Sequence, residues 1–167
     1  SVPVSKGPYE DKIKDKTIST GSKLYPQKYI NLISNTYSRT KFFDSYSNEL
    51  FDLLNSDHER LSDLNLSLIH FFMNAFSIDT PLILSSQIDY EGSKSDLNLS
   101  ICKQLGATTY ISGPFGKEYL DKESFLNEGI EILYHEFDPP RYESGNYHPY
   151  LSSLDYLFRV GPDLPWT

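Results

Sequence analysis

The sequence predicts an α/β protein, with a mainly parallel sheet flanked by helices and a helical segment in its first half. Apolar residues recur at helical spacing through residues 26 to 76. Short apolar or β-branched runs then alternate with helical patterns over residues 81 to 137. Strands separated by helices pair in parallel, because each helix returns the chain to the same end of the sheet. No change of composition divides the chain, so residues 1 to 167 are expected to form a single domain.

Three helices are expected in the first half. Pro26 suits the first turn of the first helix, and Ile30, Ile33 and Tyr37 follow at helical spacing. The second helix carries an apolar stripe over residues 43 to 54. The third helix has the strongest pattern, and its buried face is expected to comprise Leu61, Leu64, Leu68, Phe72, Ala75 and Phe76.

Strands and helices should alternate in the second half. Each expected strand is a short run of apolar, β-branched or aromatic residues. Gly106 and Gly129 follow the two helices between these strands, at the position where glycine commonly ends a helix. In chain order we expect a strand at 81–84, a helix at 95–105, a strand at 108–111, a short helix at 122–127, a strand at 130–136 and a helix at 151–160.

The composition narrows the possible partners and location. The net charge is −8 and no basic cluster exists, so we expect no nucleic-acid partner. The apolar runs are too short to span a bilayer, and no membrane insertion is expected. The single cysteine, Cys102, allows no intrachain disulfide and no zinc site, which fits a reducing, cytoplasmic location. No cofactor is evident from the sequence.

Polar residues stand where the expected parallel strands end. Ligands of open parallel sheets bind outside the carboxyl ends of the strands, which meet at one edge. Glycines there let the backbone approach a ligand, and a lysine supplies a point charge for phosphate. The residues expected to line one shared ligand-binding concavity are Ser85, Ser86, Lys94, Ser112, Gly113 and Tyr142.

These positions also have purely structural interpretations. The segment from Ser112 to Gly116 fits an ordinary strand-to-helix turn, which also requires glycine and proline. Ser93 or Ser95 fits a helix cap, with Lys94 exposed to solvent. Both interpretations stay open at the level of the sequence.

The candidate catalytic residues are His135, Asp138 and Asp155. His135 and Asp138 belong to a polar cluster after the last expected strand. If this cluster lies in a cleft, the two residues can act in general acid–base catalysis; if it does not, they are ordinary residues of an exposed loop. Asp155 lies on a largely apolar helix, so its carboxylate needs a partner, either to orient a ligand or to hold a neighbouring loop. No metal-ligand spacing is present.

An ordered set of motifs along the chain resembles the WbqC-like family. The motifs are T-P at 80–81, S-S at 85–86, Gly92 with Lys94, G-A-T-T-Y-I-S-G-P at 106–114, Tyr119-Leu120, Phe125 followed by Gly129-Ile130, and L-S-S-L-D-Y-L-F at 151–158. The family is bacterial and is often encoded among genes for O-antigen and other surface polysaccharides. The resemblance implies a role near nucleotide-sugar or glycan modification. Together with the paired strand ends, this gene context leads us to expect a cytoplasmic transferase acting on an activated sugar or nucleotide sugar. The alternative is a non-catalytic binding subunit or nucleotide-binding module of a polysaccharide-assembly system.

The chain departs from the family pattern at both ends. The Q-P-x-Y/F-x-P, D-D-x-Q-F and R-N-R segments of the family do not occur, and Val2-Pro3-Val4 corresponds to the strand after them. We therefore expect the family's N-terminal segment to be missing, which would uncover apolar sheet surface and favour self-association. Near the other end, Tyr142 and Gly161 match the family, whereas the glutamine and asparagine of the same motifs are absent.

Overall fold

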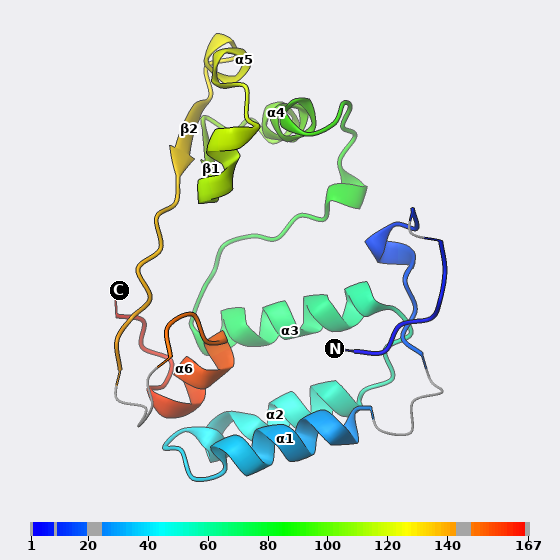
Figure 1. The fold of residues 1–167 in the computed structure, drawn as a ribbon, viewed down its shortest axis with the longest axis vertical. Coiled ribbons are helices and arrows are strands. Elements are labelled where there is room, and N and C mark those ends of the chain that lie inside the picture. Colours follow the sequence, from blue (N-terminus) through cyan, green and yellow to red (C-terminus); the bar gives the residue numbers. More distant parts are fainter. Residues whose placement is uncertain (1, 9, 20–24, 143–147, 166–167) are drawn as a thin grey trace. The chain divides into compact units, whose positions relative to one another are not determined.

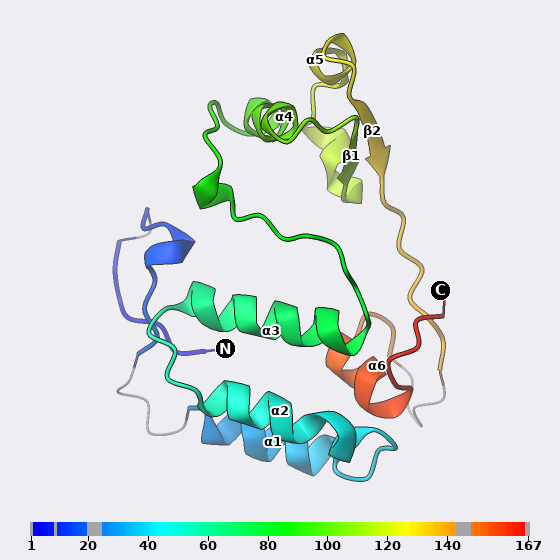
Figure 2. The ribbon, with the colours of Figure 1, turned by 180° about the vertical axis from the view of Figure 1, so that it is seen from behind.

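The computed structural model describes every residue except 1, 9, 20–24, 143–147 and 166–167. By its contacts the chain divides into two compact units. The helical unit comprises Ser1–Asp79 and Pro140–Thr167, and the strand unit comprises Thr80–Pro139. Figure 1 identifies the elements of each unit, and Figure 2 shows them from behind. None of the described helices is long and apolar enough to cross a membrane.

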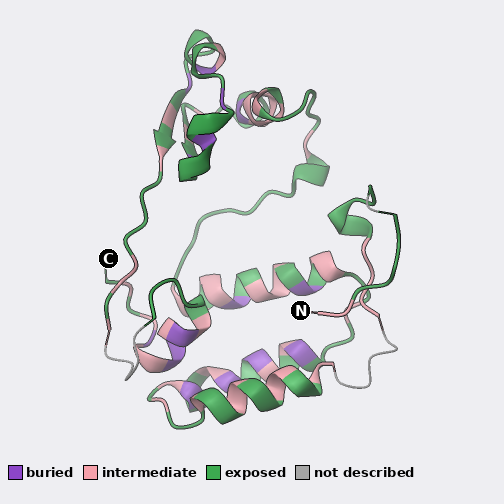
Figure 3. Ribbon diagram, in the orientation of Figure 1, coloured by how far each residue is buried: buried purple, intermediate pink, exposed green. Residues whose placement is uncertain are grey.

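The helical unit is built from helices α1 (Gln27–Tyr37), α2 (Phe43–Asn55), α3 (Leu61–Ala75) and α6 (Ser153–Arg159). All of these helices were expected from the apolar spacing of the sequence. Their buried sides carry the core, which Figure 3 shows in purple on α2, α3 and α6. This core consists of Phe43, Leu50, Leu54, Leu64, Phe71, Leu157 and Phe158.

The face of α3 expected from the sequence packs against the core, but the residues of α3 that are most buried are Leu64 and Phe71. Phe71 is buried, with only 2% of its surface exposed, whereas Phe72 is half-buried at the margin of the core. Leu64 and Phe71 are seven residues apart, so they lie on the same side of the helix, and Phe72 is turned about 100° away from them. Phe72 instead stacks on Phe76, with ring centroids 6.3 Å apart. Phe72, which was expected to be buried, is therefore only partly buried, and Phe71 occupies the closed core.

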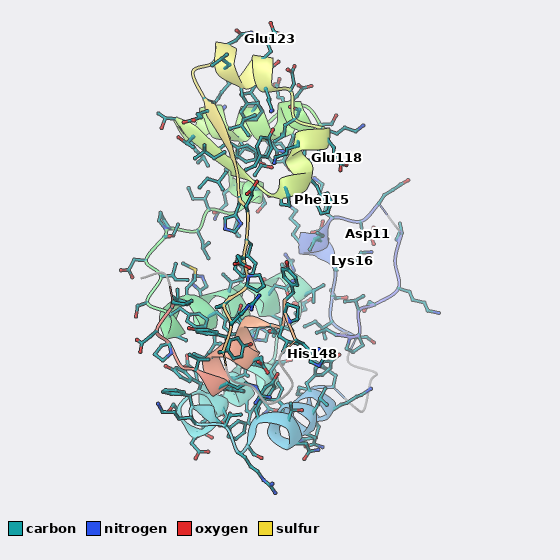
Figure 4. The ribbon with its side chains drawn as sticks, turned by 60° about the vertical axis from the view of Figure 1, so that its left-hand side comes forward. Asp11, Lys16, Phe115, Glu118, Glu123 and His148 are labelled. Atoms are coloured by element: carbon teal, nitrogen blue, oxygen red, sulfur yellow. The ribbon has the colours of Figure 1, made fainter. Side chains whose placement is uncertain are left out.

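The N-terminal segment packs as irregular backbone in the helical unit. Val4 forms an isolated antiparallel bridge with Ile18. The strand expected at Val2-Pro3-Val4 is therefore present only as this single bridge. A short 3-10 helix, η1 (Ile13–Asp15), lies between these two residues. Asp11 and Lys16, labelled in Figure 4, form an ion pair of 2.8 Å around it.

The strand unit contains a two-stranded parallel sheet. Strands β1 (Thr109–Ser112) and β2 (Glu131–Tyr134) pair in parallel, as the alternation of strands and helices predicts. Helix α4 (Ser95–Gln104) precedes β1, and helix α5 (Lys122–Asn127) connects β1 to β2. The larger, mainly parallel sheet expected from the sequence is present only as this pair within the described residues.

The prediction of a strand at residues 81–84 is wrong. This segment has no regular secondary structure, and its apolar side chains Leu82, Ile83 and Leu84 are exposed. An apolar run supplies side chains for a buried strand, but a strand exists only where another backbone accepts and donates its hydrogen bonds. No such backbone pairs with residues 81–84 in the described part of the chain.

The two faces of the sheet have different surroundings. Tyr110 and Ile132 point to the side packed with Cys102, Leu120 and Phe125. On the other face, Ile111 and Leu133 are partners in the parallel register and remain 66% and 45% exposed. Successive side chains of a strand point to opposite faces of the sheet. The side chains on the covered face are therefore buried or partly buried, and those on the other face are exposed.

Candidate functional site

The carboxyl ends of β1 and β2 meet at one edge of the sheet. Ser112 ends β1, Tyr134 ends β2, and the two residues are partners in the parallel register. The ladder continues one step further, because the backbone N–H of His135 donates to the Ser112 carbonyl at 2.8 Å. The turn after β1 is the 3-10 helix η3 (Pro114–Glu118), which therefore begins beside the end of β2. This edge is where an open parallel sheet binds ligands.

Ser112 has a packing role at this edge. Its side chain is 4% exposed, and its hydroxyl donates to the Gly113 carbonyl at 3.1 Å. Gly116 lies against it, because a Cβ atom built there would be only 2.0 Å from Ser112 Oγ and 2.9 Å from Leu120 Cδ1. A glycine is thus required at 116 for η3 to close over the end of β1.

Gly113 has no such structural requirement. Its φ of −64° is open to any residue, and no atom lies within 4 Å of the position that a Cβ would occupy. The space beside its Cα is open, so a ligand has direct access to the backbone at the end of β1. Of the residues expected from the sequence, Gly113 has the surroundings that best suit ligand contact.

Two lysines that the strand-end pattern did not reveal lie close to the ring of Tyr134, the last residue of β2. Lys117 belongs to η3, and Lys122 is the first residue of α5. Their ammonium nitrogens lie 5.3 and 5.2 Å from the centre of the Tyr134 ring. Lys117 lies within the turn after β1 and Lys122 follows it, and this position after Ser112 is the signal in the sequence that would have identified them.

Ser85, Ser86 and Lys94, which were expected at the end of a first strand, lie in short helical and loop segments. Ser85 and Ser86 begin a 3-10 helix, η2 (Ser85–Gln87), and both side chains are exposed. Lys94 precedes α4 in a strained conformation with φ of 52°. Lys94 is exposed to solvent, as the structural interpretation expected. The expected cap is absent, since no side-chain cap bond is described for α4 and the Ser95 hydroxyl instead accepts from the Asp121 N–H at 2.9 Å.

A shallow hollow of about 370 Å³ lies along α4. None of the residues expected to bind a ligand lines it, although Gly92 of the family motif does. Its floor carries two carboxylates and a lysine that is already paired with Glu128. The lining residues are Glu91, Gly92, Asp96, Leu99, Ser100, Lys103 and Gln104.

Asp155 is a buried carboxylate with a hydrogen-bond partner at each of its oxygens. It is 2% exposed and lies in the helical unit on α6. Its Oδ1 accepts from Arg159 Nε at 2.9 Å, and its Oδ2 accepts from the Tyr142 hydroxyl at 2.7 Å. Burial alone raises the pKa of Asp155, but hydrogen bonds from Arg159, Tyr142 and Tyr37 outweigh this effect and hold the pKa below its ordinary value.

Tyr37 completes this cluster from α1. Burial, the hydrogen bond with Asp155 and the charge of that carboxylate together raise the pKa of Tyr37 to about 12. The Arg159 guanidinium lies 5.6 Å from the centre of the Tyr37 ring. Asp155 therefore stays ionised and Tyr37 stays protonated at neutral pH, which suits a structural clasp more than proton transfer.

A family model described as "WbqC-like protein family" matches residues 1–165. The chain belongs to the WbqC-like protein family. It is also 29% identical, over 170 residues, to "Uncharacterized protein Rv1507c" of Mycobacterium tuberculosis, covering 99% of this chain and 73% of that protein. No solved structure matches the chain.

The motifs behind the resemblance coincide with the two clusters just described. In this WbqC-like protein, G-A-T-T-Y-I-S-G-P at 106–114 forms β1 and the start of η3. The motif L-S-S-L-D-Y-L-F at 151–158 carries Asp155 into the helical core. Tyr142, which also matches the family, donates its hydroxyl hydrogen to Asp155.

The remaining catalytic candidates lie on exposed backbone after β2. His135 and Asp138 are both exposed, and the His135 ring stacks against Phe137 with centroids 6.0 Å apart. The described residues contain no group of histidine, cysteine and carboxylate side chains able to hold a metal ion. Gly113, Lys117 and Lys122 are exposed groups near the ends of β1 and β2 in this WbqC-like protein.

Proposed function

We propose that this WbqC-like protein is a transferase that acts on an activated sugar or nucleotide sugar in bacterial surface-polysaccharide biosynthesis. One observation carries the proposal: the carboxyl ends of two parallel strands meet beside Gly113, whose Cα faces open space. Nucleotide sugars and sugar phosphates present phosphate groups, which suit an exposed backbone and nearby cations.

The family gives the second line of support. The resemblance implies surface-polysaccharide gene clusters, in which activated sugars are the common substrates. An acidic chain with a net charge of −8 needs a local cationic feature to hold a phosphorylated ligand. The edge of the sheet supplies that feature through Lys117 and Lys122.

A non-catalytic binding subunit is the second candidate. The surroundings of the three candidate catalytic residues favour this second function. Asp155 is buried and fully hydrogen-bonded, and His135 and Asp138 are exposed on backbone that follows β2. General acid–base catalysis needs a group within hydrogen-bond reach of the substrate in a shielded site. A binding module needs only the edge of the sheet.

Calorimetric titration with UDP-glucose, GDP-mannose and dTDP-glucose tests the proposal. We expect one of these ligands to bind, and we expect Gly113→Ala to weaken binding about tenfold or more, because its methyl group fills the open approach. Unfolding curves of Gly113→Ala should match those of the unaltered protein. Lys94→Ala is the matched comparison at the first expected strand end, and an effect larger than that of Gly113→Ala would move the site to α4.

Turnover separates the two candidates. With a bound nucleotide sugar, release of free nucleotide in the presence of glycan or lipid-phosphate acceptors supports a transferase. Binding without release across those acceptors supports the binding subunit. Failure of all three nucleotide sugars to bind contradicts both.

A further inference from the structure

The ring of Tyr134 is shared by two cations. Lys117 Nζ and Lys122 Nζ lie 5.3 and 5.2 Å from its centre, although the lysines come from different elements, η3 and α5. Each ammonium group is attracted to the electrons of the ring. A bound anion beside Tyr134 would in turn be attracted to both charges.

Acidic neighbours leave most of this charge uncompensated. Among the described residues, the carboxylate paired with this charge is Glu136, whose Oε1 lies 3.7 Å from Lys117 Nζ and whose side chain is exposed. Glu118 and Glu123, labelled in Figure 4 on η3 and α5, each follow one of the lysines by a single residue. Neither forms an ion pair with them, since the described residues show no other carboxylate within 4.0 Å of either nitrogen.

The backbone that carries both lysines is held in place. Gly116 packs on Ser112 and sets the position of η3. Asp121 caps α5 by accepting from the N–H groups of Glu123 and Ser124 at 3.1 and 3.4 Å. Tyr134 is anchored in β2, and its hydroxyl is buried without a hydrogen-bond partner in the described part of the chain. A site whose supporting groups are fixed loses little entropy when it binds.

We propose that Lys117 and Lys122 form a phosphate clamp beside Tyr134 at the end of β2, with the ring of Tyr134 supporting both side chains. The ligand class is a phosphate or diphosphate group, whose several oxygens can accept from two separate ammonium groups at once. This inference rests on the proposed function where the phosphate is that of an activated sugar. It also assigns two contact residues that the strand-end pattern did not reveal.

Titration of the full chain with inorganic pyrophosphate, followed by calorimetry and amide NMR shifts, tests the clamp. Glutamine keeps most of the side chain and removes the charge. Lys117→Gln and Lys122→Gln should each weaken binding about tenfold, and the double variant about a hundredfold. Lys14→Gln/Lys28→Gln is the matched control, because it removes the same charge from exposed positions of the helical unit. Its affinity should stay within about twofold of the unaltered protein.

Two further results complete the test. Lys117→Arg/Lys122→Arg should restore most of the binding and show that the glutamine variants fail through charge. Equal affinity in the double glutamine variant and the control, or no pyrophosphate binding at millimolar concentration, overturns the clamp. If a nucleotide sugar binds equally well to the double variant, the clamp is wrong while the proposed function stands. If pyrophosphate needs the lysines but no nucleotide sugar binds, the clamp stands and the proposed function fails.

Discussion

The Tyr142 hydroxyl donates to Oδ2 of Asp155 across 2.7 Å, and this bond completes the hydrogen bonding of a carboxylate that is almost fully buried. Tyr142 also packs edge-on against Tyr156, with ring centroids 5.3 Å apart. The residues that match the family here thus hold the segment at 140–142 to α6. A buried charge with every oxygen paired is costly to disrupt, because removing one side leaves the others unsatisfied.

Asp155→Asn should destabilise the protein by about 1–3 kcal/mol at pH 7, because charge-assisted hydrogen bonds to Arg159 and Tyr142 are lost. The pKa of Asp155 is below its ordinary value of 3.8 in the folded state. Its contribution is therefore present above about pH 4 and is lost as the pH falls through the folded-state pKa. Urea unfolding between pH 2 and 7 should show the two proteins converging in acid. A constant difference across this range would contradict the assignment.

Alkaline pH should destabilise the fold through Tyr37. Its pKa is about 12 when folded and 10.0 ordinarily, so the folded state holds the phenol proton more tightly. The contribution, up to about 2 kcal/mol, is complete below pH 10 and is lost as the pH rises towards 12. Tyr37→Phe should remove this part of the slope in urea unfolding curves between pH 9 and 12. The other tyrosines with raised pKa values are present in both proteins. If the free energy of unfolding falls equally steeply with pH in the unaltered protein and in Tyr37→Phe, the role of Tyr37 is refuted.

The register of α3 predicts different costs for adjacent phenylalanines. Phe71→Ala should lower the free energy of unfolding by roughly 3–5 kcal/mol, because the side chain fills a closed core. Phe72→Ala should cost clearly less, since Phe72 is half-buried and stacks on Phe76 at the margin. Chemical unfolding of both variants measures this ranking. A larger cost at Phe72 would restore the face expected from the sequence.

The two glycines after β1 should respond differently to alanine. Gly116→Ala should destabilise the strand unit by about 1–3 kcal/mol, because the new methyl group meets Ser112 Oγ and Leu120. Gly113→Ala should leave stability nearly unchanged, since its φ is ordinary and the space is open. Thermal unfolding of the two variants provides the comparison. Equal destabilisation would show that both glycines serve the turn.

The helices and the parallel pairing were predictable because they depend on local features. Apolar residues at helical spacing located α1, α2, α3 and α6. The alternation of strands and helices predicted that β1 and β2 run in parallel. The turn at Ser112–Gly113 was also located, because a glycine after a β-branched run marks the end of a strand whatever surrounds it.

What only the tertiary structure decided depends on partners far along the chain. Residues 81–84 have the composition of a strand, but no backbone in the described part of the chain pairs with them. Helix α3 turns Phe71 inward where spacing alone favoured Phe72. Lys117 and Lys122 converge on Tyr134 only because the parallel register places the end of β2 beside η3 and α5. Spacing within a segment predicts which side chains share a face, whereas hydrogen-bond pairing and charge proximity are set by the packing of one segment on another.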